Sequence, residues 1–348
     1  MLFIDHLDRI PDSLLLLIFN KVADIKALGR CCAVSKRFNF LVPQVENVVV
    51  KVDCVISGED GGLNAKGKGI IGHLVRFMIG SIVKPLQALQ HFIGPRKAIL
   101  AEVSHHSPAE VLKNFKEIQH LRIELPGGEL GVEDGVLLKW KAEFGSTLES
   151  CVIFGAASVL SKGLKTGSRR KIQLVSDDEP EGLEGLEDDN GSIPDSFYIN
   201  SWLKLRVVWT ISSLIAASAR HFLLKEIIHD HPTLQNLVLT DADGQGTLCM
   251  GREQLCEFRD KPLAASPSSN RTQVPALNMK LRYAPTLELP SGTVMQGATL
   301  VTIRPSDQTI AAKKESEGFI VGAFEGPYRA AAKILSRRRT YLLEMNSF

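Results

Sequence analysis

"RIPDSLLLLIFNKVADI", residues 9–25, decides how the start of this chain folds. Six consecutive large apolar residues, Leu14 to Phe19, follow Pro11, and charged residues stand at both ends of the stretch. An ordinary surface helix keeps one polar face toward water, but this helix has none for a turn and a half. Its exposed apolar side therefore needs a cover, which is either the rest of this chain or another protein.

Residues 10–42 are predicted to form three short helices. Pro11 suits a first helical turn, because the N–H that proline lacks has no partner inside the helix there. Asp24 is placed to cap the second helix and Ser35 to cap the third, which ends before Pro43. A unit of roughly 40 residues buries little surface by itself, so it must pack on the remaining chain or on a partner.

Length, composition and charge indicate a globular intracellular protein. The 348 residues suggest two domains, and the net charge of +2 gives no general attraction for nucleic acid. No secretory signal is expected, and the six cysteines form no CxxC pair and are predicted to be buried free thiols. The apolar stretches at 69–89 and 207–219 fall short of the roughly 20 uninterrupted apolar residues that span a bilayer. We predict two buried core helices there, with an interfacial helix as the alternative for the first.

One spacing of apolar residues recurs in the rest of the chain. It falls at i, i+3 and i+5 in four copies, which are Val45/Val48/Val50, Ile118/Leu121/Ile123, Leu148/Cys151/Ile153 and Leu234/Leu237/Leu239. This is the core spacing of a leucine-rich repeat, and helices are expected between copies at 133–144, 197–230 and 251–259. We predict an α/β (α+β) fold in which residues 46–348 form a degenerate leucine-rich-repeat-like domain with a mostly parallel sheet. Any α/β domain with short strands is the alternative.

The repeat hypothesis also predicts a binding surface. If the copies at 118–123, 148–153 and 234–239 are neighbouring parallel strands, the side chains between the apolar positions face the open side of the sheet, which solenoids use for partners. Candidate target-binding residues are His120, Arg122, Glu124 and Phe154. Residues 177–189 carry eight acidic side chains, so a disordered acidic insert is expected over about 176–194.

No motif for catalysis, a metal or a cofactor stands out. GKGIIG at 67–72 matches the dinucleotide fingerprint literally, but a long loop precedes it and no acidic residue follows about 20 positions later. The pairs His105–His106 and His229–His231 lack cysteine or carboxylate partners at the spacing of a zinc site. We therefore expect no cofactor and no metal.

The stretch 10–42, "IPDSLLLLIFNKVADIKALGRCCAVSKRFNFLV", resembles the F-box. Ile10-Pro11 stands where Leu-Pro is typical, and Leu14-Leu15 and Ile18-Phe19 fall in register with an aliphatic pair followed by Ile-Phe. Val34 to Phe38 matches the last helix, with phenylalanine where tryptophan is more usual. Residues 42–57, "VPQVENVVVKVDCVIS", are similar to a plant F-box subfamily that includes the auxin-up-regulated F-box proteins.

The resemblance implies a function. F-box proteins are substrate receptors of Skp–cullin–F-box ubiquitin ligases, in which the F-box binds a Skp-type adaptor and, through it, cullin, while the rest of the chain binds a protein target. It implies an F-box module over residues 1–45, no catalytic activity, and a nuclear or cytoplasmic location. The near-neutral charge and the short apolar stretches add the expectation of no nucleic-acid partner and no membrane span. The adaptor-binding residues that it implies are Ile10, Pro11, Leu14, Leu15, Ile18, Phe19, Val22, Leu28, Val34, Phe38 and Leu41.

Two alternatives to this function stay open. One is an F-box scaffold that acts with the adaptor but without cullin. The other is an unrecognised enzyme in the C-terminal domain, although no catalytic motif supports it.

Overall fold

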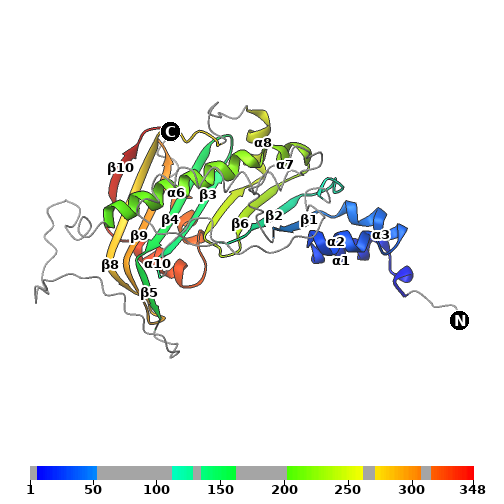
Figure 1. The fold of residues 1–348 in the computed structure, drawn as a ribbon, viewed down its shortest axis with the longest axis horizontal. Coiled ribbons are helices and arrows are strands. Elements are labelled where there is room, and N and C mark those ends of the chain that lie inside the picture. The colour runs from blue at the N-terminus through cyan, green and yellow to red at the C-terminus, as the bar shows by residue number, and fades with distance from the viewer. Residues whose placement is uncertain (1–5, 53–111, 128–134, 162–201, 262–270, 307–314) are drawn as a thin grey trace, which may run out of the picture.

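The computed structural model describes residues 6–52, 112–127, 135–161, 202–261, 271–306 and 315–348. These residues form one ten-stranded sheet with helices on both faces and a three-helix unit at one end (Figure 1). The N-terminal elements are η1 (His6–Arg9), α1 (Asp12–Val22), α2 (Ile25–Cys32), α3 (Lys36–Leu41) and η2 (Val42–Gln44). The three predicted helices are therefore present.

Side-chain caps fix where two of these helices begin. The Asp24 carboxylate accepts a hydrogen bond from the N–H of Ala27 at 2.9 Å, at the start of α2. The Ser35 hydroxyl accepts one from the N–H of Phe38 at 3.1 Å, at the start of α3. Each cap satisfies an N–H that has no partner within its helix, and both were predicted from the sequence.

The sheet has the strand order β1-β2-β6-β7-β3-β4-β9-β8-β10, and β5 pairs with β9. Its strands are β1 (Asn47–Lys51), β2 (His120–Leu125), β3 (Leu137–Phe144), β4 (Leu148–Ala156), β5 (Ser158–Ser161), β6 (Asn236–Asp241), β7 (Gly246–Met250), β8 (Leu277–Glu288), β9 (Thr293–Pro305) and β10 (Tyr341–Met345). The α/β class is confirmed.

Three of the four predicted repeat copies lie side by side. β1, β2 and β6 are parallel neighbours, and their register places Val48 beside Leu121 and Leu121 beside Leu237. The copy at 148–153 is elsewhere, because it begins β4, which lies between β3 and β9 and is antiparallel to both. The prediction that 118–123, 148–153 and 234–239 are neighbouring parallel strands is therefore wrong.

The prediction of a mostly parallel sheet is also wrong. Of the nine pairings between described strands, three are parallel, namely β1–β2, β2–β6 and β3–β7. The strands β3 and β4, β6 and β7, and β8 and β9 follow each other after short turns, which can only connect antiparallel neighbours. β3 itself replaces the helix predicted at 133–144, because Leu138, Trp140, Ala142 and Phe144 alternate with less buried residues at the period of a strand.

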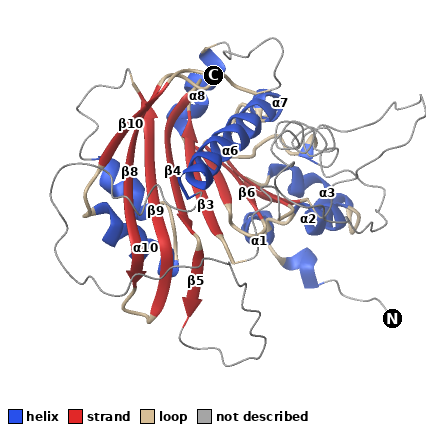
Figure 2. Cartoon of the chain, turned by 60° about the vertical axis from the view of Figure 1, so that its left-hand side comes forward, coloured by secondary structure: helices blue, strands red, loops and turns tan. Residues whose placement is uncertain are grey.

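Helices cover the two faces unequally. α6 (Trp202–Leu223), α7 (Lys225–Asp230) and α8 (Arg252–Asp260) lie on one face, and α9 (Glu315–Gly322) and α10 (Gly326–Ser336) lie on the other (Figure 2). The larger hydrophobic core lies under α6–α8 and continues into α1–α3, and the smaller one lies under α9 and α10. Residues Lys204–Asp230 are apolar and long enough to cross a membrane, but 61% of their most apolar window is buried inside this protein. The core helix predicted at 207–219 is confirmed.

Some predictions fall on other residues. The acidic insert at 176–194, the apolar stretch at 69–89, the glycine motif at 67–72, His105–His106 and Cys54 lie outside the described residues. The five described cysteines are free, as predicted, but they are not all buried. Cys151 is buried, Cys256 is exposed, and the other three are half-buried, because two lie in the small helical unit and one on the polar face of β7.

Candidate adaptor-binding and target-binding surfaces

The F-box-like helices have an interior of their own. Phe19 of α1 and Phe38 of α3 pack edge to face, with ring centroids 5.1 Å apart. These two residues, together with Leu15, Leu28 and Leu41, are buried in the larger core. All five were predicted to contact the adaptor, whereas the structure places their side chains inside the protein. Once three helices pack together, only one side of each can face a partner.

A second set of apolar side chains lies on the outside of α1. Leu14, Leu17, Ile18 and Val22, which we call the α1 stripe, are between 40% and 56% exposed. Their spacing of three and four residues places them along one side of the helix. Leu14, Ile18 and Val22 were predicted to bind the adaptor, and their exposure leaves them available for it.

Residues around the α1 stripe add to the exposed apolar surface. Val34, which was predicted, is exposed, and Pro11 is exposed at the start of α1, whereas Ile10 is half-buried against the core. Sequence reasoning missed Leu17 and Phe40, the latter 71% exposed. Both had a signal, because Leu17 belongs to the six-residue apolar run and Phe40 cannot share a helix side with the buried Phe38 two positions earlier.

Arg37 fixes the N-terminus of α1 to α3. Its guanidinium donates hydrogen bonds to the backbone carbonyls of Leu7 and Ile10 and pairs with the carboxylate of Asp12, with a nitrogen–oxygen distance of 2.6 Å. Exposed ion pairs stabilise little by themselves, but these contacts set the direction in which the chain enters α1. The side chains that begin the stripe are therefore held in place.

The helical unit is joined firmly to the sheet. The N–H of Val49 in β1 donates to the carbonyl of Ala23 at 2.8 Å, and Asp24 and Val49 form a parallel bridge. The side-chain oxygen of Asn20 accepts from the N–H groups of Glu46 and Asn47. Because α1–α3 and the sheet also share one hydrophobic core, a molecule bound to the sheet is held in a fixed position relative to the α1 stripe.

The predicted target-binding residues divide into two groups. His120 and Arg122 of β2 are exposed, and Glu124 is half-buried on the same face. Phe154 was wrongly placed in this group, since it is fully buried in the smaller core against Phe324, with ring centroids 5.8 Å apart. The reason is that β4 belongs to the half of this face that α9 and α10 cover.

β2 and its neighbours form a polar face that no described helix covers. The register places Glu124 beside Lys51 on one side and beside Thr240 on the other, and continues through Thr247 to Lys141. Burial alone would raise the pKa of the Glu124 carboxyl, but its hydrogen bond with Arg122 and the charges of Lys51 and Arg122 together lower that pKa. The cover by α9 begins at β3, where the Lys141 ammonium lies over the Phe319 ring, so we call only the surface made by β1, β2, β6 and β7 the open face.

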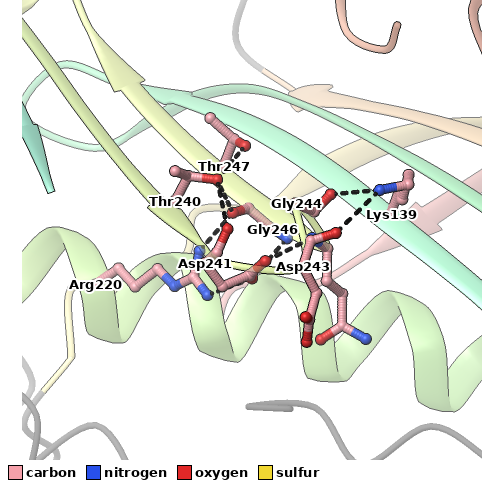
Figure 3. Close-up of polar contacts among 9 residues, drawn as sticks. Lys139, Arg220, Thr240, Asp241, Asp243, Gly244, Gly246 and Thr247 are labelled. Carbon is pink, nitrogen blue, oxygen red and sulfur yellow. Dashed lines mark hydrogen bonds and ion pairs between the residues drawn. The ribbon is translucent and has the colours of Figure 1, made fainter. Parts of the chain in front are cut away.

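A buried ion pair holds α6 to the turn between β6 and β7 (Figure 3). The Arg220 guanidinium donates to the Asp241 carboxylate at 3.0 Å and to the carbonyl of Gly246 at 2.8 Å, and it lies over the Trp140 ring. The Asp241 carboxylate also accepts from the N–H groups of Gln245 and Gly246. Because both charged groups are buried and hydrogen-bonded to each other and to the backbone, the cluster supports the fold.

The most strongly perturbed histidine is also structural. Burial lowers the pKa of His221 to about 3, so the ring is neutral at pH 7. Its Nε2 lies 2.9 Å from the carbonyl of Gly145, which can only accept, so Nε2 carries the proton and Nδ1 accepts from the Thr272 hydroxyl. Phe144 stacks on the ring. Among the residues that the structure describes, no group of three or more His, Cys, Asp or Glu could hold a metal ion.

Comparison with known proteins identifies the family of this chain. The F-box-like family model matches residues 7–45. The F-box protein At5g46170 of Arabidopsis thaliana is 56% identical over 380 residues, which cover 99% of this chain and 94% of that protein. The chain belongs to the F-box proteins. The F-box proteins AUF1 and AUF2 of the same plant are 34% and 35% identical to this F-box protein over 99% of its length and all of theirs. No solved structure gives a significant match.

Proposed function

We propose that this F-box protein is a substrate receptor of a Skp–cullin–F-box ubiquitin ligase. Its helices α1–α3 bind a Skp-type adaptor and, through it, cullin, while the sheet domain recruits a protein target for ubiquitination. The receptor catalyses nothing itself, and it acts by raising the concentration of a target lysine near the conjugating enzyme. The free cysteines support a reducing compartment, and we propose the nucleus or the cytoplasm.

The α1 stripe carries this proposal. Its four apolar side chains are exposed on a helix whose opposite side is already packed into the core. Contiguous apolar surface of this kind marks a protein-binding site, and central apolar residues supply most of the binding energy there. The adaptor thus covers the side of α1 that the rest of the described chain leaves exposed.

The firm join between α1–α3 and the sheet supports the second half of the proposal. A receptor must hold its target at a defined distance from the conjugating enzyme, and a shared core with the Ala23–Val49 hydrogen bond provides that rigidity. The open face is the proposed target surface. His120 and Arg122 are exposed there, and substitutions at such positions change binding with little effect on folding.

A paired charge-substitution experiment tests adaptor binding. In the test variant, Leu14 and Ile18 are both changed to Glu, which places charges at the centre of the α1 stripe. In the matched control, Val207 and Ile211, two exposed apolar residues of α6 with the same spacing, receive the same changes. We expect the test variant to lose a recombinant Skp-type adaptor in co-purification and the control to keep it, with unchanged circular dichroism for both.

A pull-down of the wild-type protein from plant cells separates the two F-box hypotheses. Cullin recovered together with the adaptor supports the ligase receptor, and adaptor recovered from plant cells always without cullin supports a scaffold. Equal adaptor recovery by the test variant and the control would contradict the proposed binding surface.

A further inference from the structure

The two edges of the sheet differ in how they are protected. At one edge, the chain itself closes β1, because Ala23 accepts the N–H of Val49 and Asp24 bridges to the same residue. At the other edge, β10 pairs with β8 on one side, and no strand among the described residues pairs with its other side. Figure 1 shows β10 at the outer end of the sheet.

β10 has two of the features that protect an edge strand, its short length and the charge of Glu344, but it lacks others. Its sequence, "YLLEM", contains no proline and no lysine, and its register with β8 runs from Tyr341 to Met345 without a bulge. Leu342 is 75% exposed, and Leu343 is also exposed. An edge that is largely apolar and regular, and that no described strand pairs with, can accept a further strand.

The pattern of hydrogen bonds tells which backbone groups of β10 point outward. In a strand, the N–H and C=O groups of alternate residues point to opposite sides. The N–H of Trp140 in β3 donates to the carbonyl of Gln245 beside β7, so the backbone groups of the even-numbered residues of β3 point toward β7. Those of the odd-numbered residues therefore point toward β4. The same alternation can be followed strand by strand through the registers of β4 and β9. At the start of β8, the backbone groups of the even-numbered residues therefore point toward β9. The N–H of Ser306, which donates to Ala276, agrees with this direction.

The odd-numbered residues of β8 therefore face β10. Their partners in β10 are Tyr341, Leu343 and Met345, whose backbone groups point back toward β8. It follows that the N–H and C=O groups of Leu342 and Glu344 point away from the sheet. These groups form the hydrogen-bonding template for an additional strand.

The charges beside β10 distinguish the two ends of this template. Arg337, Arg338 and Arg339 are exposed and lie just before β10, whereas Glu344 is near its other end. A strand added antiparallel to β10 runs in the opposite direction. The residues on the C-terminal side of its paired segment would therefore lie beside the three arginines. Acidic residues at that end would be attracted, because arginine pairs well with carboxylates.

We propose that the free edge of β10 binds an extended segment of the target protein, an inference that rests on the proposed role in target recruitment. The segment adds antiparallel to β10, bonds to the backbone of Leu342 and Glu344, places apolar side chains beside Leu342 and Leu343, and continues into acidic residues beside Arg337–Arg339. Main-chain hydrogen bonds give the affinity, and the side-chain pattern and the acidic end give the specificity.

A second copy of this chain fits the edge less well. Symmetric antiparallel pairing of two β10 strands about Leu343 places each Leu342 opposite Glu344 of the other copy. In that register Arg339 and Arg338 would lie opposite Ser347 and Phe348, neither of which has an acidic side chain. An extended target segment with an acidic end can instead place apolar side chains beside Leu342 and carboxylates beside the arginines.

A display library of random ten-residue peptides, selected on the full-length protein, tests the proposal. We expect enriched peptides to combine alternating apolar residues with acidic residues toward the C-terminus. The key variant is Leu342→Pro, which removes an outward N–H without breaking the ladder to β8. The matched control Leu342→Ala loses the same side chain and keeps the N–H.

For the best enriched peptide, made synthetically, Leu342→Pro should weaken binding at least about tenfold more than Leu342→Ala does. The double variant Arg337→Glu/Arg338→Glu should also weaken it and reduce its salt dependence. Equal binding by the proline and alanine variants, or enriched peptides without acidic ends, would overturn the proposal. So would concentration-dependent dimerisation lost in Leu342→Pro, or peptide binding that appears only after residues 177–193 are deleted.

The result is independent of adaptor binding. Leu342→Pro should keep the Skp-type adaptor in co-purification, because β10 and α1 lie at opposite ends of the sheet (Figure 1). If the wild-type protein fails to bind the adaptor, the proposed ligase function falls, whatever the peptide measurement shows.

Discussion

The buried ion pair between Arg220 and Asp241 predicts a large and non-additive effect on stability. Asp241→Asn keeps the shape of the side chain and removes its charge, and Arg220→Met removes the other charge while filling similar space. Both side chains are 1% exposed and their charged atoms are 3.0 Å apart. Either single substitution therefore leaves one uncompensated charge inside the protein.

The magnitude follows from what each remaining group loses. In Asp241→Asn, the Arg220 guanidinium keeps the Gly246 carbonyl and the Trp140 ring but loses its carboxylate. In Arg220→Met, the Asp241 carboxylate keeps the N–H groups of Gln245 and Gly246 but loses its counter-charge. Breaking one side of a buried pair costs about 3–5 kcal/mol, whereas removing both charges costs much less than the sum.

Urea unfolding at pH 7, followed by circular dichroism, measures all four proteins. We expect each single variant to lose about 3–5 kcal/mol. The double variant should lose less than the two single losses combined, by at least about 1 kcal/mol. Single losses below about 1 kcal/mol, or strictly additive losses, would refute the argument that the two charges depend on each other.

Three further predictions concern single positions. Because the unfolded His221 takes up a proton near pH 6.5 and the folded one only near pH 3, the free energy of unfolding should fall as the pH drops through this range. The slope should reach up to about 1.4 kcal/mol per pH unit and be smaller in His221→Gln, and equal acid melting curves would contradict it. Arg122→Glu should change stability by less than about 1 kcal/mol and weaken target capture, whereas Leu121→Asp should unfold the domain, as thermal melts and pull-downs can check. Gly155→Ala should lose about 1–3 kcal/mol, because a Cβ there would lie 2.4 Å from the Trp209 ring. Gly318→Ala, in open space inside α9, should instead melt at the wild-type temperature or slightly above it, because alanine favours a helix by about 0.5–1 kcal/mol over glycine.

Local signals in the sequence predicted the three N-terminal helices and the core helix, although the helix predicted at 133–144 is the strand β3. Asp24 and Ser35 each act within three residues, so their capping role can be read from the sequence alone. The uncharged stretch at 207–219 correctly indicated a buried helix. The sequence could not show that the flanking Arg206 and Arg220 are also buried, because Thr299 and Asp241 bind them from distant strands.

The strand order was beyond the sequence. The i, i+3, i+5 spacing correctly identified the buried residues of the copies at β1, β2 and β6. The spacing does not indicate which strands are neighbours in the sheet. The copy in β4 has the same spacing but pairs antiparallel with β3, to which a hairpin joins it, and with β9, which is distant in the chain. The free edge of β10 depends on this order and therefore could not be predicted.

The candidate site was predicted in part. Resemblance located the F-box helices, but it could not separate the residues that hold the three helices together from those that face outward. Leu15 and Phe19 are inside and Leu14 and Ile18 outside, although all four stand in one apolar run. The packing of α1 against α2, α3 and β1 decides which of these residues are buried and which are exposed. The same packing leaves Leu17 and Phe40 exposed.

Hydrogen–deuterium exchange of the full-length protein, with and without a recombinant Skp-type adaptor, tests the central claim most directly. The account predicts that the adaptor slows amide exchange in α1, over residues 14–22, and near Phe40 in α3, and leaves β2 and β10 unchanged. Exchange in α1 that is the same with and without bound adaptor, or protection confined to the sheet, would contradict it.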